Sequence, residues 1–142
     1  NVIGPYQMTR AVAGQMKTQG RGAVVNVSSI AGVMGVGSSI AYTASKGAVL
    51  SMTREIAAIY ARQGIRANAL CPGPVLTPLP ATFLSEDATR HRRLVHISMG
   101  RFGEAAEMVN GALFLASDES SYMTGQSLLI DGGITSTYTT PE

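Results

Sequence analysis

Residues 23–46 read AVVNVSSIAGVMGVGSSIAYTASK, and they combine a short apolar run, a glycine-rich segment and the start of a small-residue helix. The run at 23–29 is β-branched and almost continuously apolar, which predicts a buried strand. From about Ala41 to Arg62, apolar residues recur at helical spacing, so a helix is expected after the glycine-rich loop. A buried strand, a loop and a helix in this order are the building unit of an α/β fold.

The same alternation of strands and helices continues on both sides of this stretch. Further helices are expected over 1–19, 85–97 and 104–117, and further buried strands over 65–71 and 127–133. Strands that alternate with helices in units of about 30 residues are typical of a parallel sheet with helices on both faces. Three strands are few for such a sheet and would leave one edge bare, so residues 1–142 are interpreted as part of a larger α/β domain.

The composition excludes several classes of protein. Apolar residues make up 45% of the chain and charged residues 14%, which is typical of a well-buried globular domain. The formal net charge of +2 is too small to indicate a nucleic-acid partner. No apolar run reaches the roughly 20 residues that a membrane-spanning helix needs, so no membrane association is expected. The single cysteine, Cys71, cannot form an internal disulfide, and a cytoplasmic location is expected.

Tyr42 and Lys46 lie four residues apart at the start of the expected helix over 41–62 and therefore share one helix face. The spacing alone is a modest signal, because a surface tyrosine lying along a lysine stem is the ordinary alternative. Ser29 ends one predicted strand, the segment PGPVLT at 72–77 follows the next, and ligands of open α/β sheets collect at the carboxyl ends of strands. A hydroxyl, a phenol and an ammonium that meet there form an acid–base site, in which the cation favours the phenolate.

The segments VVNVSS, YTASK, CPGPVLT and MTGQSLLIDGG occur in the order and at the distances found in the short-chain dehydrogenase/reductase family. All of the chain except its tail resembles the carboxyl-terminal half of such an enzyme, of the 3-oxoacyl reductase-like or alcohol dehydrogenase-like kind. The resemblance implies the last three strands and flanking helices of a Rossmann-type, doubly wound parallel sheet. It also implies an NAD(P)-dependent oxidoreductase that interconverts an alcohol and a ketone, or a 3-oxoacyl-type carbonyl, by hydride transfer.

The resemblance assigns roles to residues at matching positions. Tyr42 would be the general acid/base that protonates a carbonyl or deprotonates an alcohol. Ser29, rather than Ser28, would hydrogen-bond the substrate oxygen. Lys46 would favour the phenolate of Tyr42 and bind the nicotinamide ribose, so that both residues lie against the cofactor. Asn1 matches the asparagine that holds a water molecule in the proton relay.

The loop that follows the strand over 65–71 corresponds to the segment under the nicotinamide carboxamide in this family. Its matching residues are Pro72, Gly73, Val75 and Thr77, of which Val75 would act through its backbone and Thr77 through its hydroxyl. The implied cofactor is NAD or NADP. The choice between the two stays open, because the residue that decides it follows an earlier strand that is not in this sequence.

A group of apolar side chains is expected to line a substrate pocket, although half of them are equally compatible with the core. The group consists of Met34, Leu76, Leu79, Phe83, Leu84 and Met99. The expected substrate is a small-molecule carbonyl or alcohol. No metal site is expected, because His91 and His96 have no partner at metal-ligand spacing.

The family's phosphate-binding glycine loop has no match in this sequence. The similar string GVMGVG at 32–37 follows a predicted strand, but no helix begins at its last glycine. It is interpreted as a loop beside the substrate. An amino-terminal half of the dinucleotide-binding domain is therefore expected outside residues 1–142, and these residues alone are expected to be inactive.

The expected helix over 41–62 has little charge around its circumference, which indicates burial on more than one side. Its apolar stripe consists of Val49, Met52, Ile56 and Ile59, and its other faces carry Ala48, Ala57, Ala58 and Ala61. A homodimer or homotetramer is expected, formed mainly by this helix and the helix over 1–19. The resemblance implies a second interface through 104–117 and the last strand. The alternative to an enzyme is a catalytically silent fragment or scaffold that associates through these helices.

Overall fold

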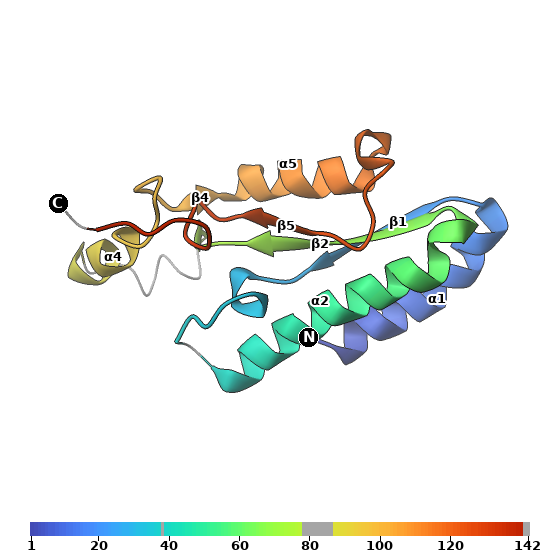
Figure 1. Cartoon of the computed structure of the whole chain (residues 1–142), viewed down its shortest axis with the longest axis horizontal. Helices are drawn as coiled ribbons and strands as arrows, with labels where there is room; N and C mark the ends of the chain where they lie inside the picture. Colours follow the sequence, from blue (N-terminus) through green and yellow to red (C-terminus); the bar gives the residue numbers. More distant parts are fainter. Residues whose placement is uncertain (38, 78–86, 141–142) are drawn as a thin grey trace.

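The structure is a computed structural model that describes residues 1–37, 39–77 and 87–140. Within these ranges, the central element is a three-stranded parallel sheet with the strand order β1–β2–β5. Its strands are β1 (Gly22–Val27), β2 (Ile65–Pro72) and β5 (Ser127–Ile130). Because all three run in the same direction, their carboxyl ends lie at one edge of the sheet, toward the left of Figure 1.

Helices cover both faces of this sheet (Figure 1). α1 (Ile3–Gln19) and α2 (Ile40–Tyr60) lie on one face, and α5 (Ala105–Ala116) lies on the other. A short helix, α4 (Asp87–Leu94), lies beyond the carboxyl ends of the strands. This arrangement confirms the predicted α/β fold with a parallel sheet and flanking helices.

The middle strand β2 is built from small residues, and this lets α2 pack closely against it. Ala67, Ala69 and Cys71 each have 0% exposed surface. Leu50 of α2 packs with Ala69 and Cys71. Further along α2, Ile56 packs with Ala67. The buried position predicted for Cys71 is confirmed.

A buried polar contact fixes the position of α2 on β1. The side-chain amide of Asn26 donates to Thr53 Oγ1 at 2.9 Å, and Thr53 Oγ1 donates to the carbonyl of Val49 at 2.8 Å. Asn26 and Thr53 are 7% and 1% exposed, so neither can replace this contact with water. A buried donor without an acceptor is costly. The contact therefore fixes the position of α2 along the axis of β1, and with it the position of the first turns of α2.

The boundaries differ from the predicted ones where a polar side chain starts a new element. β1 ends at Val27 rather than at residue 29, because the Ser29 side chain accepts a hydrogen bond from the backbone of Ala31 at 3.1 Å. That bond caps a short 3-10 helix, η1 (Ile30–Gly32). A second 3-10 turn, η2 (Ala61–Gln63), follows α2.

Two short parallel strands are missing from the sequence-based prediction. β3 (Val75–Leu76) pairs with β4 (Gly103–Glu104). Strands of two residues carry no periodicity, so no pattern in the sequence indicates them. Between them, α4 accounts for the middle of the predicted helix over 85–97, whose first two residues lie outside the described ranges.

The predicted orientation of α2 is wrong at two residues. Ala57, expected on a face away from the apolar stripe, is 5% exposed and packs in the core with Ile56 and Ala67. A Cβ atom on Gly125 would lie 3.4 Å from the Ala57 side chain, so the segment before β5 also covers it. Ile59, expected within the apolar stripe, is 52% exposed instead. Ala57 and Ile56 thus share the side of α2 that packs on β2, and Ile59 lies outside it.

Candidate active site

The candidate site lies at the carboxyl edge of the sheet. The register pairs Val27 with Leu70 and Pro72 with Ile130, so the segments that leave β1, β2 and β5 start close to one another. Ser29 is the second residue after β1, and the first turns of α2 carry Tyr42 and Lys46 at the same end of the sheet (Figure 1). The fold thus brings to one edge the three side chains that the sequence singles out for acid–base chemistry.

Lys46 connects α2 to the end of β1. Its ammonium donates to the carbonyl of Val27 at 3.0 Å and lies 5.7 Å from the centroid of the Tyr42 ring. This distance is within the range of a cation–π contact. An ammonium has three donors, and Lys46 uses one of them on a described residue. A positive charge therefore stands beside the phenol with donors left for a ligand.

The two serines after β1 have different surroundings. Ser28 is 3% exposed and its hydroxyl donates to the carbonyl of Lys46 at 2.9 Å, so it ties η1 to α2. The Ser29 hydroxyl accepts from the backbone of Ala31 and donates to no described residue. Its proton is free for a ligand oxygen. Of the two hydroxyls, only that of Ser29 has a proton not committed to a described residue, and its role toward substrate stays a prediction.

Asn1 lies against the same helix, and the residue that joins them was not singled out from the sequence. The Asn1 side chain donates to Ser45 Oγ at 3.1 Å, and Ser45 Oγ donates to the carbonyl of Tyr42 at 2.7 Å. Ser45 lies between Tyr42 and Lys46 in the sequence, which is the only signal that could have found it. Asn1, which precedes α1, is thus held against the first turns of α2, which carry Tyr42 and Lys46.

Cys71 lies beneath this site without taking part in its chemistry. Burial raises the pKa of its thiol, and hydrogen bonds from the Ser29 backbone and from the Ser28 and Ser127 side chains offset this only in part. A buried thiol with a raised pKa is a poor nucleophile. Cys71 is therefore a packing residue, as its position on the central strand also indicates.

Gly32 packs so closely against α2 that no space is left for a side chain at this position. A Cβ atom at residue 32 would lie 2.9 Å from both the carbonyl oxygen of Lys46 and the hydroxyl of Ser28. The string GVMGVG therefore supplies a close backbone approach here, and its first glycine allows η1 to lie on α2 at the level of Lys46. Ser29 and Lys46 owe their relative position to this contact.

We expect Gly32→Ala to push η1 away from α2, because two of the three nearest atoms belong to the Lys46 carbonyl, which is backbone and cannot rotate aside. The overpacking should cost about 1–3 kcal/mol of stability, measured by denaturant unfolding. Turnover of the full-length protein should fall further than this loss explains, since Ser29 moves relative to Tyr42. Gly35→Ala is the matched control, because a Cβ atom there meets no described atom within 4 Å. Equal stability and activity of the two variants would contradict this account.

The loop after β2 runs beside the turn after β5. A Cβ atom on Gly73 would lie 2.6 Å from Cα of Asp131, and the Gly73 amide donates to the carbonyl of Ile130 at 2.9 Å. Asp131 in turn accepts from the backbone amides of Gly133, at 2.9 Å, and Thr135, at 3.2 Å, and from the Thr135 hydroxyl. The sequence element DGG thus forms an anchored turn that supports the loop.

The predicted cofactor-loop residues occupy the start of this segment. Pro72 ends β2, Val75 belongs to β3, and Thr77 is half-buried directly after it. Gly73 joins them at the close approach to the Asp131 turn. The loop is therefore held from both sides at the carboxyl edge, and its role toward a cofactor stays a prediction.

The predicted substrate-lining group is only partly described. Met34, Leu76 and Met99 are 38%, 45% and 62% exposed, so each offers apolar surface on the molecule. The remaining members, Leu79, Phe83 and Leu84, lie outside the described residues. Met99 and Pro74 line a small hollow of about 60 Å³. The existence of a common substrate pocket stays a prediction.

Two larger hollows lie away from Tyr42 and Lys46. One, of about 760 Å³, is at the amino ends of the strands and includes Arg21, Arg66 and Tyr122. The other, of about 540 Å³, runs along β1 and the facing side of α1. The Arg66 guanidinium already donates to the carbonyls of Leu115, Ser117 and Met123 and to Ser120, so its donors hold the end of α5 in place.

The described part of the chain, residues 1–37, 39–77 and 87–140, lacks two further kinds of feature. It contains no cluster of three or more histidine, cysteine, aspartate or glutamate side chains placed to hold a metal ion. None of its helices combines the length and apolar character that crossing a membrane requires.

Comparison with known families identifies the class of protein that this fold and site define. A family model described as Enoyl-(Acyl carrier protein) reductase matches residues 1–135. The chain belongs to this family of short-chain dehydrogenases/reductases.

Its relatives are named as dehydrogenases and reductases. The chain is 42% identical over 139 residues to the Inactive 2-(S)-hydroxypropyl-CoM dehydrogenase 2 of Xanthobacter autotrophicus, covering 95% of this chain and 60% of that protein. It is 42% identical over 134 residues to the 3-oxoacyl-(acyl-carrier-protein) reductase of Thermotoga maritima, covering 94% and 54%. The structure of a gluconate 5-dehydrogenase from Burkholderia cenocepacia in complex with NADP and tartrate is similar, with a TM-score of 0.88 and 37% identity, covering 95% and 53%. The chain spans little more than half the length of these relatives.

Proposed function

We propose that the full-length protein is an NAD(P)-dependent oxidoreductase that interconverts an alcohol and a ketone or 3-oxoacyl-type carbonyl. The observation that carries this proposal is the placement of Tyr42 beside the Lys46 ammonium, which is itself bound to the end of β1. Ser29, with an uncommitted proton, starts the adjoining 3-10 helix. The dehydrogenase and reductase names of the relatives support the same reaction class.

The donors at this edge fit the nicotinamide end of the cofactor. Lys46 has ammonium donors left for ribose hydroxyls, and Thr77 adds a hydroxyl on the neighbouring loop. Pro72, Gly73 and Val75 form the backbone against which the carboxamide would lie. When bound, the nicotinamide supplies the hydride for reduction and accepts it in the reverse direction.

The protein's own residues would manage the proton and the substrate oxygen. Ser29 donates a hydrogen bond to the carbonyl oxygen and so holds it near Tyr42. The Tyr42 hydroxyl gives its proton to this oxygen as negative charge develops there, which is general acid catalysis. The ammonium of Lys46 stabilises the phenolate that remains. Asn1, held on α2 through Ser45, would position the water that returns a proton to the site.

The test is incubation of the full-length protein with NADH and NADPH, each against a panel of ketones and 3-oxoacyl thioesters. Carbonyl-dependent oxidation of one reduced cofactor is the expected result, and it also decides between NAD and NADP. Absence of cofactor binding to the folded full-length protein would contradict the proposal.

Residues 1–142 would then be the carboxyl-terminal part of one dinucleotide-binding and catalytic domain. The length of the relatives supports this, as does the open edge of β1 with the hollow of about 540 Å³ beside it. These residues alone should be inactive, because no glycine loop in the described part of the chain offers a helix amino terminus to the pyrophosphate. An intact mass of the native protein near that of residues 1–142 would contradict this proposal.

A catalytically silent scaffold is the second candidate, because one relative at 42% identity is named as inactive. Apolar side chains exposed on α1 and α2 would then provide association without catalysis. The two candidates differ in one measurable property, since a scaffold would not oxidise a reduced cofactor in the presence of any carbonyl.

In either case the full-length protein should form a homodimer or homotetramer, with a cytoplasmic location. Large apolar side chains are exposed on α1 and α2, including Ile3, Tyr6 and Ile59 at 71%, 55% and 52%. A second exposed pair, Val109 and Leu113 at 62% and 66%, lies on α5. Exposed apolar patches of this kind mark association surfaces.

We expect Ile59→Arg to lower the oligomeric state seen by sedimentation, because it places a charge in the interface formed by α2. Ile59 is exposed, so the fold should be kept. Ile59→Leu at the same position preserves apolar character and should leave the oligomer unchanged. An Ile59→Arg protein that sediments like the parent would contradict an interface at this face. Ala57 is unsuitable for this test because it is buried in the core.

A further inference from the structure

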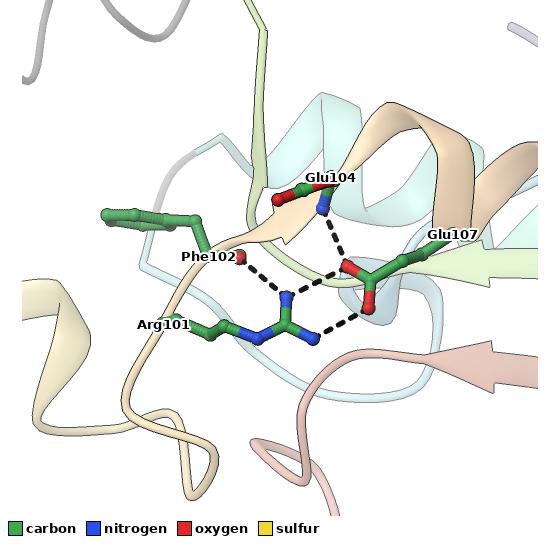
Figure 2. Close-up of polar contacts among 4 residues, drawn as sticks. All are labelled: Arg101, Phe102, Glu104 and Glu107. Carbon is green, nitrogen blue, oxygen red and sulfur yellow. Dashed lines mark hydrogen bonds and ion pairs between the residues drawn. The ribbon is translucent and has the colours of Figure 1, made fainter.

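An ion pair with two hydrogen bonds joins Arg101 to the first turn of α5 (Figure 2). Arg101 Nη2 donates to Glu107 Oε1 at 2.7 Å, and Nη1 donates to Glu107 Oε2 at 2.9 Å. The same Oε2 accepts from the backbone amide of Glu104 at 2.7 Å, and Nη1 also reaches the carbonyl of Phe102 at 3.2 Å. We call this arrangement of Arg101, Phe102, Glu104 and Glu107 the clamp.

The clamp is connected to the loop that follows β2. Glu104 belongs to β4, which pairs with β3 so that Val75 faces Gly103 and Leu76 faces Glu104. The Gly103 amide donates to the carbonyl of Pro74 at 3.0 Å. A continuous set of bonds therefore runs from Glu107 through β4 to β3, which leads directly into Thr77.

The clamp contains the bond from the Glu104 amide to Glu107, which is part of the capping box that starts α5, but its ion pair adds little to stability. Its two charged side chains are 48% and 37% exposed, and exposed ion pairs contribute little to stability. Its geometry is nevertheless strict, because a guanidinium and a carboxylate joined by two bonds fix each other's orientation. Such a pair determines position more than stability.

The charge of the clamp is also constant over the working pH range. The hydrogen bond from Arg101, followed by that from the Glu104 backbone, lowers the pKa of Glu107 to about 2. Because this pKa is lowered in the folded protein, the contribution of the ionised carboxylate is present above its ordinary pKa near 4.5 and is lost only as the pH falls toward 2. The clamp is therefore a fixed support rather than a pH-dependent switch.

We propose that Arg101 and Glu107 are positioning residues for the proposed cofactor site, and that they hold the backbone of Val75 and the hydroxyl of Thr77 where the nicotinamide carboxamide binds. This inference rests on the proposed function. Their effect passes through Glu104, β4 and β3, and neither side chain needs to touch the cofactor.

The test measures the dissociation constant of the reduced cofactor, kcat, KM and the thermal midpoint in the full-length protein. Glu107→Ala and Arg101→Met should each weaken cofactor binding about tenfold, within the ~10²-fold that a small misplacement can cost. The double variant should bind cofactor no more weakly than either single variant, because both substitutions break the same contact. With saturating cofactor, kcat should stay within a factor of two or so of the parent. The thermal midpoint should change little in Arg101→Met and fall modestly in Glu107→Ala, which also loses the capping bond to the Glu104 amide.

Two further variants separate positioning from charge alone. Exchange of the pair, Arg101→Glu with Glu107→Arg, restores opposite charges but leaves the Glu104 amide without its acceptor, so cofactor affinity should not recover. Glu119→Gln removes an exposed carboxylate at the far end of α5 and should have no effect. Unchanged cofactor affinity in Glu107→Ala, with the parent binding normally, would overturn this inference alone. A folded parent that binds neither NADH nor NADPH would overturn the proposed function and this inference with it.

Discussion

Tyr42→Phe is expected to lower turnover of the full-length protein by about 10²–10⁴-fold, which is the usual contribution of a general acid or base. Phenylalanine keeps the ring beside the Lys46 ammonium and removes only the hydroxyl that exchanges the proton. Tyr42 is 39% exposed and its hydroxyl has no hydrogen bond to a described residue, so the fold should not depend on this hydroxyl. Cofactor affinity should therefore stay close to that of the parent.

Tyr60→Phe is the matched control for this variant. Tyr60 is the last residue of α2, at the opposite end of the sheet from the site. Loss of its hydroxyl should leave turnover unchanged. Comparable activity of Tyr42→Phe and the parent would contradict the role of Tyr42 as the general acid/base.

The second large effect is expected for Lys46→Met, which should lower turnover and weaken cofactor binding together. Methionine keeps an unbranched stem of similar length but loses the charge near the Tyr42 ring and the bond to the Val27 carbonyl. Hydrogen bonds to charged groups contribute about 1.5–3 kcal/mol, so each of the two quantities should change by about 10- to 100-fold. A decrease in kcat with an unchanged cofactor dissociation constant would contradict the double role of Lys46.

The chain offers one natural control for this substitution. Lys17, the other lysine, lies in the last turn of α1 and is remote from the carboxyl edge. Lys17→Met should therefore bind cofactor and turn over like the parent. Kinetics and calorimetry on the three proteins distinguish a local effect of Lys46 from a general effect of charge.

Elements with a clear pattern could be predicted from the sequence. The strand that leads into Ser29 and the strand that contains Cys71 are short, apolar and β-branched or small, and both are found within about two residues of the predicted bounds. Tyr42 and Lys46 could be singled out because their spacing and position coincide with a helix start at the carboxyl edge. Periodicity and parallel topology were sufficient for these features.

Features that depend on contacts between distant segments could not be predicted. The pairing of β3 with β4 rests on two residues in each strand, and the Arg101–Glu107 clamp becomes visible only once that pairing is known. Ala57 was placed on the wrong face because alanine is compatible with both a core and a surface position. Gly32 was assigned to a loop, and its close approach to Lys46 is a property of the folded backbone alone.

The most direct test of the central claim follows a deuterium label in the full-length protein. The reduced cofactor carries deuterium in both C4 positions of the nicotinamide, and the alcohol product is analysed by mass spectrometry for label on its carbinol carbon. The account predicts one deuterium transferred to this carbon by the parent, and almost no product from Tyr42→Phe although that variant still binds cofactor. Unlabelled product from the parent, or labelled product formed at the parent's rate by Tyr42→Phe, would contradict it.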